Sequence, residues 1–231
     1  MKVKGIASLA AGAAMLACSG MASAETVLQY VPQSDLKILD PHVTTATITR
    51  THAYMVYDML FAVGNDMKPY PQMVGDWSVT DDGLLYSFTL RNGLKFHNGQ
   101  PVTSADVIAS LKRWGQKNAM GQIMLKRLDK MEAVNDKTFT IKLTETMPFL
   151  LMALGTPADQ IAAIMRKEDA EKDPDMALKT AIGSGPYKFV PEEWVPGSKV
   201  VYVKNEDYVP RNEPSVGATG GKVVKAIVEE T

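Results

Sequence analysis

The sequence has few of the residues that cross-link or metallate a small protein. Its 231 residues include one cysteine, Cys18, and three histidines. A single thiol cannot form an internal disulfide, so an apolar core must hold the chain together. His42 and His52 have no neighbouring ligand pattern, and His97, between two turn residues, is predicted to lie on the surface. No metal site and no bound cofactor are therefore expected.

The sequence also lacks an excess of charge of either sign. Its formal net charge is -1, with 22% charged and 45% hydrophobic residues. Binding to phosphate backbones needs clustered cations, and no such cluster occurs, which argues against nucleic acid as a partner. This ordinary mixture of residues excludes a collagen, a coiled coil and a membrane protein with many spans.

The first segment, residues 1–24, predicts an export signal. Lys2 and Lys4 form a short cationic start, and the apolar run 6–17 is too short to span a bilayer stably. Residues 22–24, Ala-Ser-Ala, are the pattern of small residues that a signal peptidase requires. A periplasmic location follows as an expectation.

Cys18 lies inside this segment and has two interpretations. It could be a lipid-attachment site, because a small residue precedes it, but Met15 fits that motif poorly. The preferred interpretation is a small residue of the apolar run. On that view the mature chain begins at Glu25 and contains no cysteine.

The rest of the chain predicts a mixed α/β fold. Strands are expected where β-branched and aromatic residues alternate, and helices where apolar residues recur every three or four positions. The expected strands are Thr26–Val31, Trp77–Thr80, Leu84–Leu90, Phe139–Leu143, Tyr187–Val190, Val200–Val203 and Val223–Val228. The expected helices are Thr47–Leu60, one that begins at Thr103, Pro148–Leu154, and Lys167–Ala181 with an interruption at Pro174.

Four local motifs predict how some of these elements are joined or begin. Asp81-Asp82-Gly83 and Asn98-Gly99 are turns in which glycine can adopt positive φ, and Pro196-Gly197 joins the hairpin of the last part of the chain. Thr103 can accept a first-turn amide while Asp106 reaches back to the Thr103 amide, which is a capping box.

The catalytic motifs are mostly missing. Ser184, in Ile-Gly-Ser-Gly-Pro, lacks the glycine two positions earlier that a nucleophile elbow requires, and no phosphate-binding loop occurs. The carboxylate pairs Asp81-Asp82 and Glu192-Glu193 could act as acid and base, although solvated turn carboxylates are the ordinary explanation. An enzyme is not expected, and a secreted carboxylate-dependent hydrolase is the alternative.

Several sequence blocks resemble a known family. Residues 77–107, WSVTDDGLLYSFTLRNGLKFHNGQPVTSADV, closely resemble the signature of the family 5 solute-binding proteins, the receptors of peptide and nickel ABC importers. Residues 183–189, GSGPYKF, are similar to the family's Gly-Pro-Tyr turn. As in the family, residues 194–197 and 200–208 follow it, and Leu-Asp-Pro at 39–41 also matches.

The resemblance implies a type II periplasmic binding protein-like fold. In that fold a mixed-sheet domain I contains an inserted domain II, and a domain III closes over the ligand by hinge motion. The expected divisions are residues 1–24 as signal peptide, 25–44 and 166–231 as parts of domain I, and 45–165 as domain II. Members are about twice this length, so we expect the C-terminal lobe to be missing and the chain to be a fragment.

The resemblance also implies a function without chemistry. The chain is expected to bind di- or oligopeptides outside the cytoplasm and to present them to an ABC permease in the inner membrane. Nickel complexes or oligosaccharides are the alternative solutes within the family. A free-standing interaction module is a third hypothesis, and it requires the chain to fold cooperatively and as a monomer.

Candidate ligand contacts come from the walls of domains I and II. Thr44 and Thr45 could face the cleft or cap a helix, and Tyr54 and Tyr57 could form an aromatic wall or pack in the core. Trp114 and Met120 could form an adaptable apolar surface, although the spacing of Trp114 with the apolar helix face favours the core. Two more candidates, which could offer backbone amides or form a structural turn, are Ser184 and Gly185.

Overall fold

The computed structural model describes residues 27–157 and 159–214. Residues 31–214 of this part belong to one compact unit, and residues 27–30 belong to a second unit. The elements follow the order α1 (Thr47–Val56), β1 (Phe61–Val63), β2 (Pro69–Pro71), β3 (Val74–Val79), β4 (Leu85–Leu90), α2 (Ser104–Gly115), α3 (Ala119–Lys126), β5 (Leu128–Ala133), β6 (Thr138–Leu143), α4 (Leu150–Ala153), α5 (Lys167–Ala170), β7 (Tyr187–Phe189), a 3-10 turn (Pro191–Glu193) and β8 (Tyr202–Lys204). The described part is therefore mixed α/β, as predicted.

An antiparallel sheet in the order β3-β4-β6-β5 is the largest element of the unit. In β4 the side chains of Tyr86, Phe88 and Leu90 are buried while those between them are not, which confirms the predicted alternation. Phe88 lies opposite Phe139 of β6, and their rings stack with centroids 5.1 Å apart. Gly83, in the turn between β3 and β4, has φ of +68°, a conformation that glycine adopts without strain.

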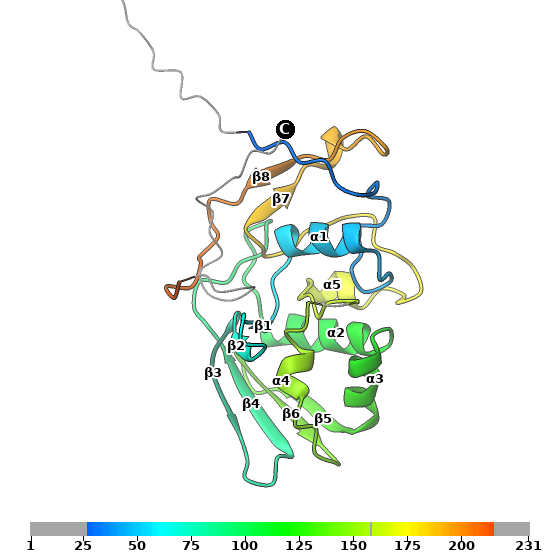
Figure 1. Ribbon diagram of the computed structural model, residues 1–231. Coiled ribbons are helices and arrows are strands. Elements are labelled where there is room, and N and C mark those ends of the chain that lie inside the picture. The colour runs from blue at the N-terminus through cyan, green and yellow to red at the C-terminus, as the bar shows by residue number, and fades with distance from the viewer. Residues whose placement is uncertain (1–26, 158, 215–231) are drawn as a thin grey trace, which may run out of the picture. The chain divides into compact units, whose positions relative to one another are not determined.

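Helix α2 begins where the sequence places its cap. The Thr103 hydroxyl accepts the Asp106 amide, and an Asp106 carboxylate oxygen accepts the Thr103 amide at 2.8 Å. Such a cap typically contributes about 1 kcal/mol to helix stability. Val107, Leu111 and Trp114 are buried on one face, and α2, α3 and α4 lie on the same side of the sheet (Figure 1).

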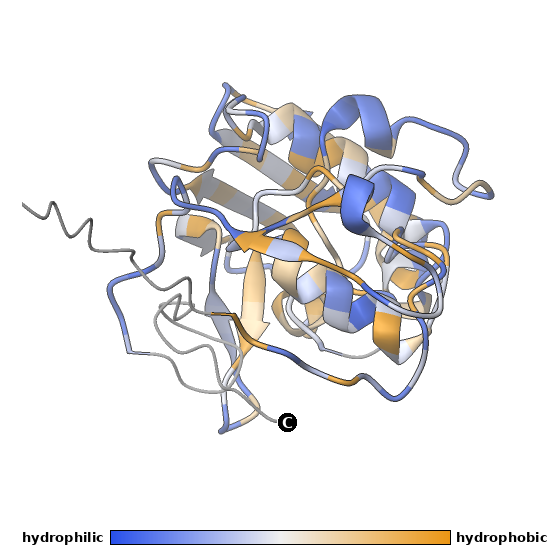
Figure 2. Cartoon of the chain, turned by 90° about the horizontal axis from the view of Figure 1, so that it is seen from above, coloured by the Kyte–Doolittle hydropathy of each residue, from blue (hydrophilic) through white to orange (hydrophobic). Residues whose placement is uncertain are grey.

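Two apolar clusters fill the unit. The first cluster lies between the four-stranded sheet and helices α2 to α4, and it includes Phe88, Trp114 and Phe139. The second cluster joins α1 to β7 and β8, and Val56 and Phe189 are among its buried members. Figure 2 shows hydrophobic and hydrophilic residues interspersed along the strands and helices, and in β4 this mixture corresponds to alternating buried and less buried side chains.

The structure corrects several expected elements. Residues 27–31 form no strand, and of the expected helix 167–181 only α5 is helical. The sequence analysis missed α3 and β5. The hairpin of β7 and β8, closed by a turn in which Gly197 has φ of +80°, is confirmed. The expected strand at 223–228 lies outside the described residues.

Candidate functional site

The structure gathers three of the eight candidate residues at one junction. Tyr57 follows the last residue of α1, and Ser184 and Gly185 belong to the turn that precedes β7. The Gly185 amide donates to the carbonyl of Val56 at 2.8 Å, so this turn lies directly on the C-terminal end of α1. We call residues 183–185 the glycine turn.

Both glycines of the glycine turn are required by close backbone approach. A Cβ at position 183 would lie 1.9 Å from the Val56 carbonyl oxygen and 2.9 Å from the Tyr57 ring. A Cβ at position 185 would lie 2.6 Å from the Met55 carbonyl oxygen. Because Cβ atoms are not found so close to backbone, no other residue fits at either position without moving α1.

Two side chains from distant segments hold the carbonyl of Gly185. The Asn205 side-chain amide and His97 Nε2 each lie 3.0 Å from this oxygen. The His97 backbone amide also donates to the Gly183 carbonyl at 2.8 Å. The glycine turn is therefore fixed on one side by α1 and on the other by His97 and Asn205.

Ser184 lies between these anchored carbonyls. Its side chain is buried, with the residue 3% exposed, and within the described residues its hydroxyl has no hydrogen-bond partner. It borders a narrow depression, too tight for a water molecule, that is also lined by Leu94, Lys95, Asp207 and others. Lys95 and Asp207 place one charge of each sign at its walls. The Ser184 hydroxyl thus lies beside these two charged residues at the wall of the depression.

The segment that follows β8 is tied to the edge of β1 and β2. Tyr208 donates its hydroxyl proton to the buried carboxylate of Asp58 at 3.0 Å. Burial, reinforced by the Asp58 charge, raises the pKa of Tyr208, so the phenol stays protonated. Arg91 and Arg211 both donate to the Gln72 carbonyl, and Arg91 also binds the Val209 carbonyl at 2.6 Å. These contacts fix the position of Asp207 beside the depression.

The two candidate tyrosines are largely buried. Tyr57 is 2% exposed and belongs to the second cluster. Burial is the main cause that raises its pKa. Tyr54 packs against the same cluster, and burial raises its pKa to about 12. Both phenols are therefore neutral at ordinary pH, and Tyr57 packs in the core as the alternative interpretation stated.

Trp114 and Met120 lie away from the glycine turn, on α2 and α3. Trp114 is 1% exposed, and its indole N–H donates to the Gln160 carbonyl at 2.9 Å. The ring packs under Gly121, where a Cβ would meet it at 2.9 Å. Met120 is 44% exposed at the start of α3. Trp114 thus fills the first cluster, and only Met120 of this pair offers its side chain to solvent.

Thr44 and Thr45 precede α1. The Thr44 hydroxyl accepts the Ala46 amide at 3.2 Å, while the helix begins after Ala46 without a side-chain cap. Thr44 is half-buried and Thr45 is exposed. Neither residue caps α1, and the Thr45 side chain is accessible to a solute.

A wider groove lies between α2 and α5 and contains none of the candidate residues. Its volume is about 390 Å³. Its lining residues are Ala105, Ile108, Ala109, Lys112, Arg113, Gln116, Ala133, Lys167, Ala170, Glu171, Lys172 and Pro174. Small apolar residues line much of the groove, and its charged residues come from both helices and from the segment after α5.

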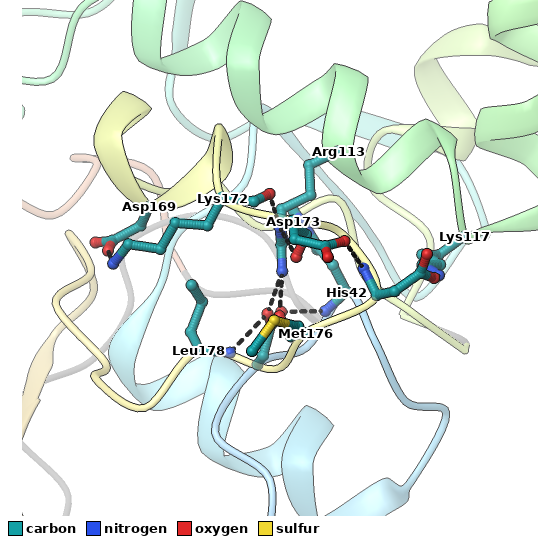
Figure 3. Close-up of polar contacts among 10 residues, drawn as sticks. His42, Arg113, Lys117, Asp169, Lys172, Asp173, Met176 and Leu178 are labelled. Carbon is teal, nitrogen blue, oxygen red and sulfur yellow. Dashed lines mark hydrogen bonds and ion pairs between the residues drawn. The ribbon is translucent and has the colours of Figure 1, made fainter.

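Beside this groove, a buried ion pair explains the Leu-Asp-Pro motif. Arg113 and Asp40 are 1% and 0% exposed in their side chains and lie 2.8 Å apart. The second carboxylate oxygen of Asp40 accepts the His42 amide at 2.9 Å. Arg113 also donates to the carbonyls of Lys172 and Met176 (Figure 3). The pair therefore joins three separate segments of chain and is structural.

Sequence reasoning missed most of the residues that hold the glycine turn. His97 was expected at the surface, but it is partly buried and its ring binds Gly185. Asn205 and Tyr208 belong to a block that carries the family resemblance, and that block was the available signal for them. Asp58 follows Tyr57 directly, but no pattern in the sequence predicts that its side chain meets Tyr208.

The carboxylate pairs do not resemble a catalytic acid and base. Asp82 accepts the Thr80 hydroxyl at 2.6 Å and the Leu84 amide at 3.0 Å, and the first of these bonds lowers its pKa. A general acid needs a raised pKa, so Asp82 is suited to holding its turn. Glu193 pairs with Lys199 across the β7–β8 connection. Among the described residues, no group of three or more His, Cys, Asp or Glu is placed to hold a metal ion.

Comparison with solved structures defines the class of protein. A dipeptide binding protein from Pseudoalteromonas sp. SM9913 in complex with Met-Leu matches with a TM-score of 0.67 and 23% identity, over 79% of this chain and 40% of that one. The PBP AgaA from A. tumefaciens R10, in complex with agropinic acid, matches with a TM-score of 0.62 and 30% identity, over 74% of this chain and 34% of that one. The chain has the mixed α/β fold of the type II periplasmic binding proteins.

Comparison with sequences gives the family. The profile described as bacterial extracellular solute-binding proteins, family 5 Middle, matches residues 68–226. A probable peptide ABC transporter periplasmic-binding protein, y4tO of Sinorhizobium fredii, is 42% identical over 94% of this chain and 41% of its own length. The glutathione-binding protein GsiB of Salmonella choleraesuis is 30% identical over 83% of this chain and 36% of its own. The chain belongs to the family 5 solute-binding proteins and spans about two fifths of the length of these relatives.

Among the described residues, no helix has the length and apolar character needed to cross a bilayer.

Proposed function

We propose that the chain is the solute-binding component of an ABC importer and that its solutes are di- or oligopeptides. The observation that carries the proposal is the relative named as a probable peptide-transporter protein, which is 42% identical over 94% of the chain. The second relative is named for glutathione, which is itself a small peptide. In this proposal the protein binds without catalysis, and closure on the solute is recognised by a permease in the inner membrane.

The proposed ligand contacts are those of the sequence analysis, weighted by their surroundings. Exposed or potentially accessible polar groups suit the role best, which favours Thr44, Thr45 and Ser184. Met120 would supply an adaptable apolar contact. Four more members of the proposed set are Tyr54, Tyr57, Trp114 and Gly185. Among these four, the deeply buried Tyr57 and Trp114 would support the walls of the ligand site from behind and would not contact the solute directly.

The domain division is proposed with one refinement. Residues 25–44 and 166–231 are assigned to domain I and residues 45–165 to an inserted domain II. Helix α1 packs in the second cluster with β7 and β8, whereas the sheet and α2 to α4 form the first cluster. We therefore place the first boundary closer to Leu60, so that α1 belongs to domain I.

A periplasmic location is part of the proposal. It rests on the predicted signal at residues 1–24 and on relatives named as periplasmic-binding proteins. Fractionation of cells that express the chain should recover a shortened product in the periplasmic extract. A Cys18→Ser variant should be processed and released in the same way as the parent. If the parent stays in the membrane fraction while the Cys18→Ser variant is released, Cys18 is a lipid-attachment site.

A solute screen by thermal unfolding tests the function. A ligand that binds only the folded chain stabilises it by RT ln(1 + [L]/Kd), about 2.7 kcal/mol at a hundredfold excess over Kd. We expect di- and tripeptides to raise the unfolding temperature and glucose oligomers to leave it unchanged. A shift with nickel complexes, oligosaccharides or agropinic acid but with no peptide would reassign the solute. If the chain hydrolyses a glycoside or an ester and Asp82→Asn abolishes that activity, the alternative function, a carboxylate-dependent hydrolase, replaces the proposal.

A further inference from the structure

His97 connects the two apolar clusters. It lies in the turn between Leu94 and Val102, whose apolar side chains belong to the first cluster. Its backbone amide donates to Gly183 and its ring contacts Gly185, and these residues lie against α1 of the second cluster. The residue therefore bonds twice to the glycine turn, at the carbonyls on either side of Ser184.

The chemistry of the acceptor fixes the state of the imidazole. A carbonyl oxygen only accepts, so Nε2 of His97 must carry the proton that it donates to Gly185. Burial, with a smaller contribution from the charge of Lys188, lowers the pKa of His97 to about 4 although the bond to Gly185 acts in the opposite direction. The ring is therefore neutral at pH 7, with Nε2 protonated and Nδ1 bare.

The same carbonyl has a second donor. The Asn205 amide binds Gly185 from the segment after β8, again at 3.0 Å. On its other side the Gly185 amide is held by Val56. Three segments distant in sequence thus converge on one residue, Gly185, through hydrogen bonds to its amide and its carbonyl.

We infer that His97 is a positioning residue, which with Asn205 holds the glycine turn on the end of α1 and so determines where the Ser184 hydroxyl lies. The part of this inference that concerns a solute rests on the proposed function. The part that concerns the turn does not. Removing the imidazole leaves the Gly185 carbonyl with one side-chain donor instead of two.

Hydrogen exchange on the free chain tests the positioning role. Because one hydrogen bond contributes about 1 kcal/mol, His97→Ala should speed exchange of the Gly185 amide about fivefold to tenfold. His97→Gln, whose side-chain amide can donate in the same direction, should restore most of the protection. Gln100→Ala, an exposed residue of the same turn, is the matched control and should behave as the parent.

Two results would overturn the inference. In the first, Gly185 exchanges at the parental rate in His97→Ala. In the second, the amides of β4 and β6 accelerate as much as Gly185, which is the behaviour of a residue that merely contributes to global stability. Urea unfolding of each variant separates local from global change.

A peptide titration then tests the link to binding. For a peptide that binds the parent, His97→Ala should weaken affinity about fivefold or more while His97→Gln and Gln100→Ala retain it. Equal affinities in all four chains would limit His97 to the turn and refute its role toward the solute. Failure of the parent to bind any peptide would instead refute the proposed function, while the exchange measurement would still decide the positioning role.

Discussion

Lowering the pH from 7 to 5 is expected to destabilise the fold, because His42 and His52 are buried as neutral rings. The two residues are 0% and 1% exposed. Burial lowers the pKa of His42 from 6.5 to about 4 and that of His52 to about 3. At pH 5 these two histidines are therefore protonated in the unfolded chain but remain neutral in the folded chain. Stability is complete above the unfolded pKa of 6.5 and is lost progressively as the pH falls towards 4.

The size of the effect follows from these values. Between pH 7 and pH 5 a histidine with an unfolded pKa near 6.5 becomes almost fully protonated, whereas neither folded ring does. This difference amounts to about 2 kcal/mol for each residue and about 4 kcal/mol for the pair. His97, whose pKa is also lowered to about 4, adds a further loss of the same sign. A loss of this size is a large share of the stability of an ordinary domain.

Urea unfolding at the two pH values measures the loss directly. In the parent, the free energy of unfolding should fall by at least about 4 kcal/mol from pH 7 to pH 5. His52→Asn keeps a polar group near the Tyr202 hydroxyl, which lies 2.7 Å from His52 Nδ1, but it cannot titrate. Its pH-dependent loss should be about 2 kcal/mol smaller, whatever the variant loses at pH 7. An identical loss in parent and variant would show that the buried ring is not what responds to acid.

Two further predictions concern packing and can be measured by urea unfolding at pH 7. Arg113→Met leaves the Asp40 charge buried without its partner, so its free energy of unfolding should fall by about 3–5 kcal/mol. The double variant Arg113→Met, Asp40→Asn should lose less than the sum of the losses in the two single variants. Additive losses would show that Arg113 and Asp40 do not stabilise each other. Gly183→Ala would place a Cβ 1.9 Å from the Val56 carbonyl oxygen and should lose about 3 kcal/mol or more. Its control, Gly99→Ala, meets nothing within 4 Å at a φ of +85° and should lose only about 1–2 kcal/mol, so equal losses would refute the steric argument.

The elements that sequence predicted well are those specified by neighbouring residues. Strand β4 follows from its alternation, the cap of α2 from Thr103 and Asp106, and the turn at Gly83 from two aspartates and a glycine. Each of these depends on contacts within a few positions of chain. The family blocks were readable for the same reason, because they consist of turns, caps and packed aromatics.

The errors have a common physical origin in distant contacts. Residues 27–31 include two valines and a tyrosine, yet they form no strand, because a strand depends on a pairing partner that local composition does not supply. Beyond α5 the chain does not continue as a helix: Pro174 has no amide hydrogen to donate, and the carbonyls of Lys172, Asp173 and Met176 accept hydrogen bonds from Arg113 instead. Propensity alone carries no information about such a partner.

The candidate site shows the same limit. The sequence drew attention to Ser184 and Gly185 through their glycine-rich motif, and the structure places them against α1. It contained no sign that His97 would turn inwards to Gly185, because that contact spans 88 positions of chain. Trp114 was a candidate ligand contact whose helical spacing favoured the core, and its 1% exposure agrees with the core position.

The long sequence separation between two pairs of hydrogen-bonded side chains has a consequence for how the chain folds. His52 meets Tyr202, and Asp58 meets Tyr208, each across 150 positions. The polypeptide is synthesised from its N-terminus, so α1 is complete long before β7 and β8, against which it packs, have been made. Native contacts of such high sequence separation form slowly. The second cluster therefore completes its packing only after β8 has been synthesised, whereas the partners of β4 in the first cluster, β3 and β6, are available much earlier.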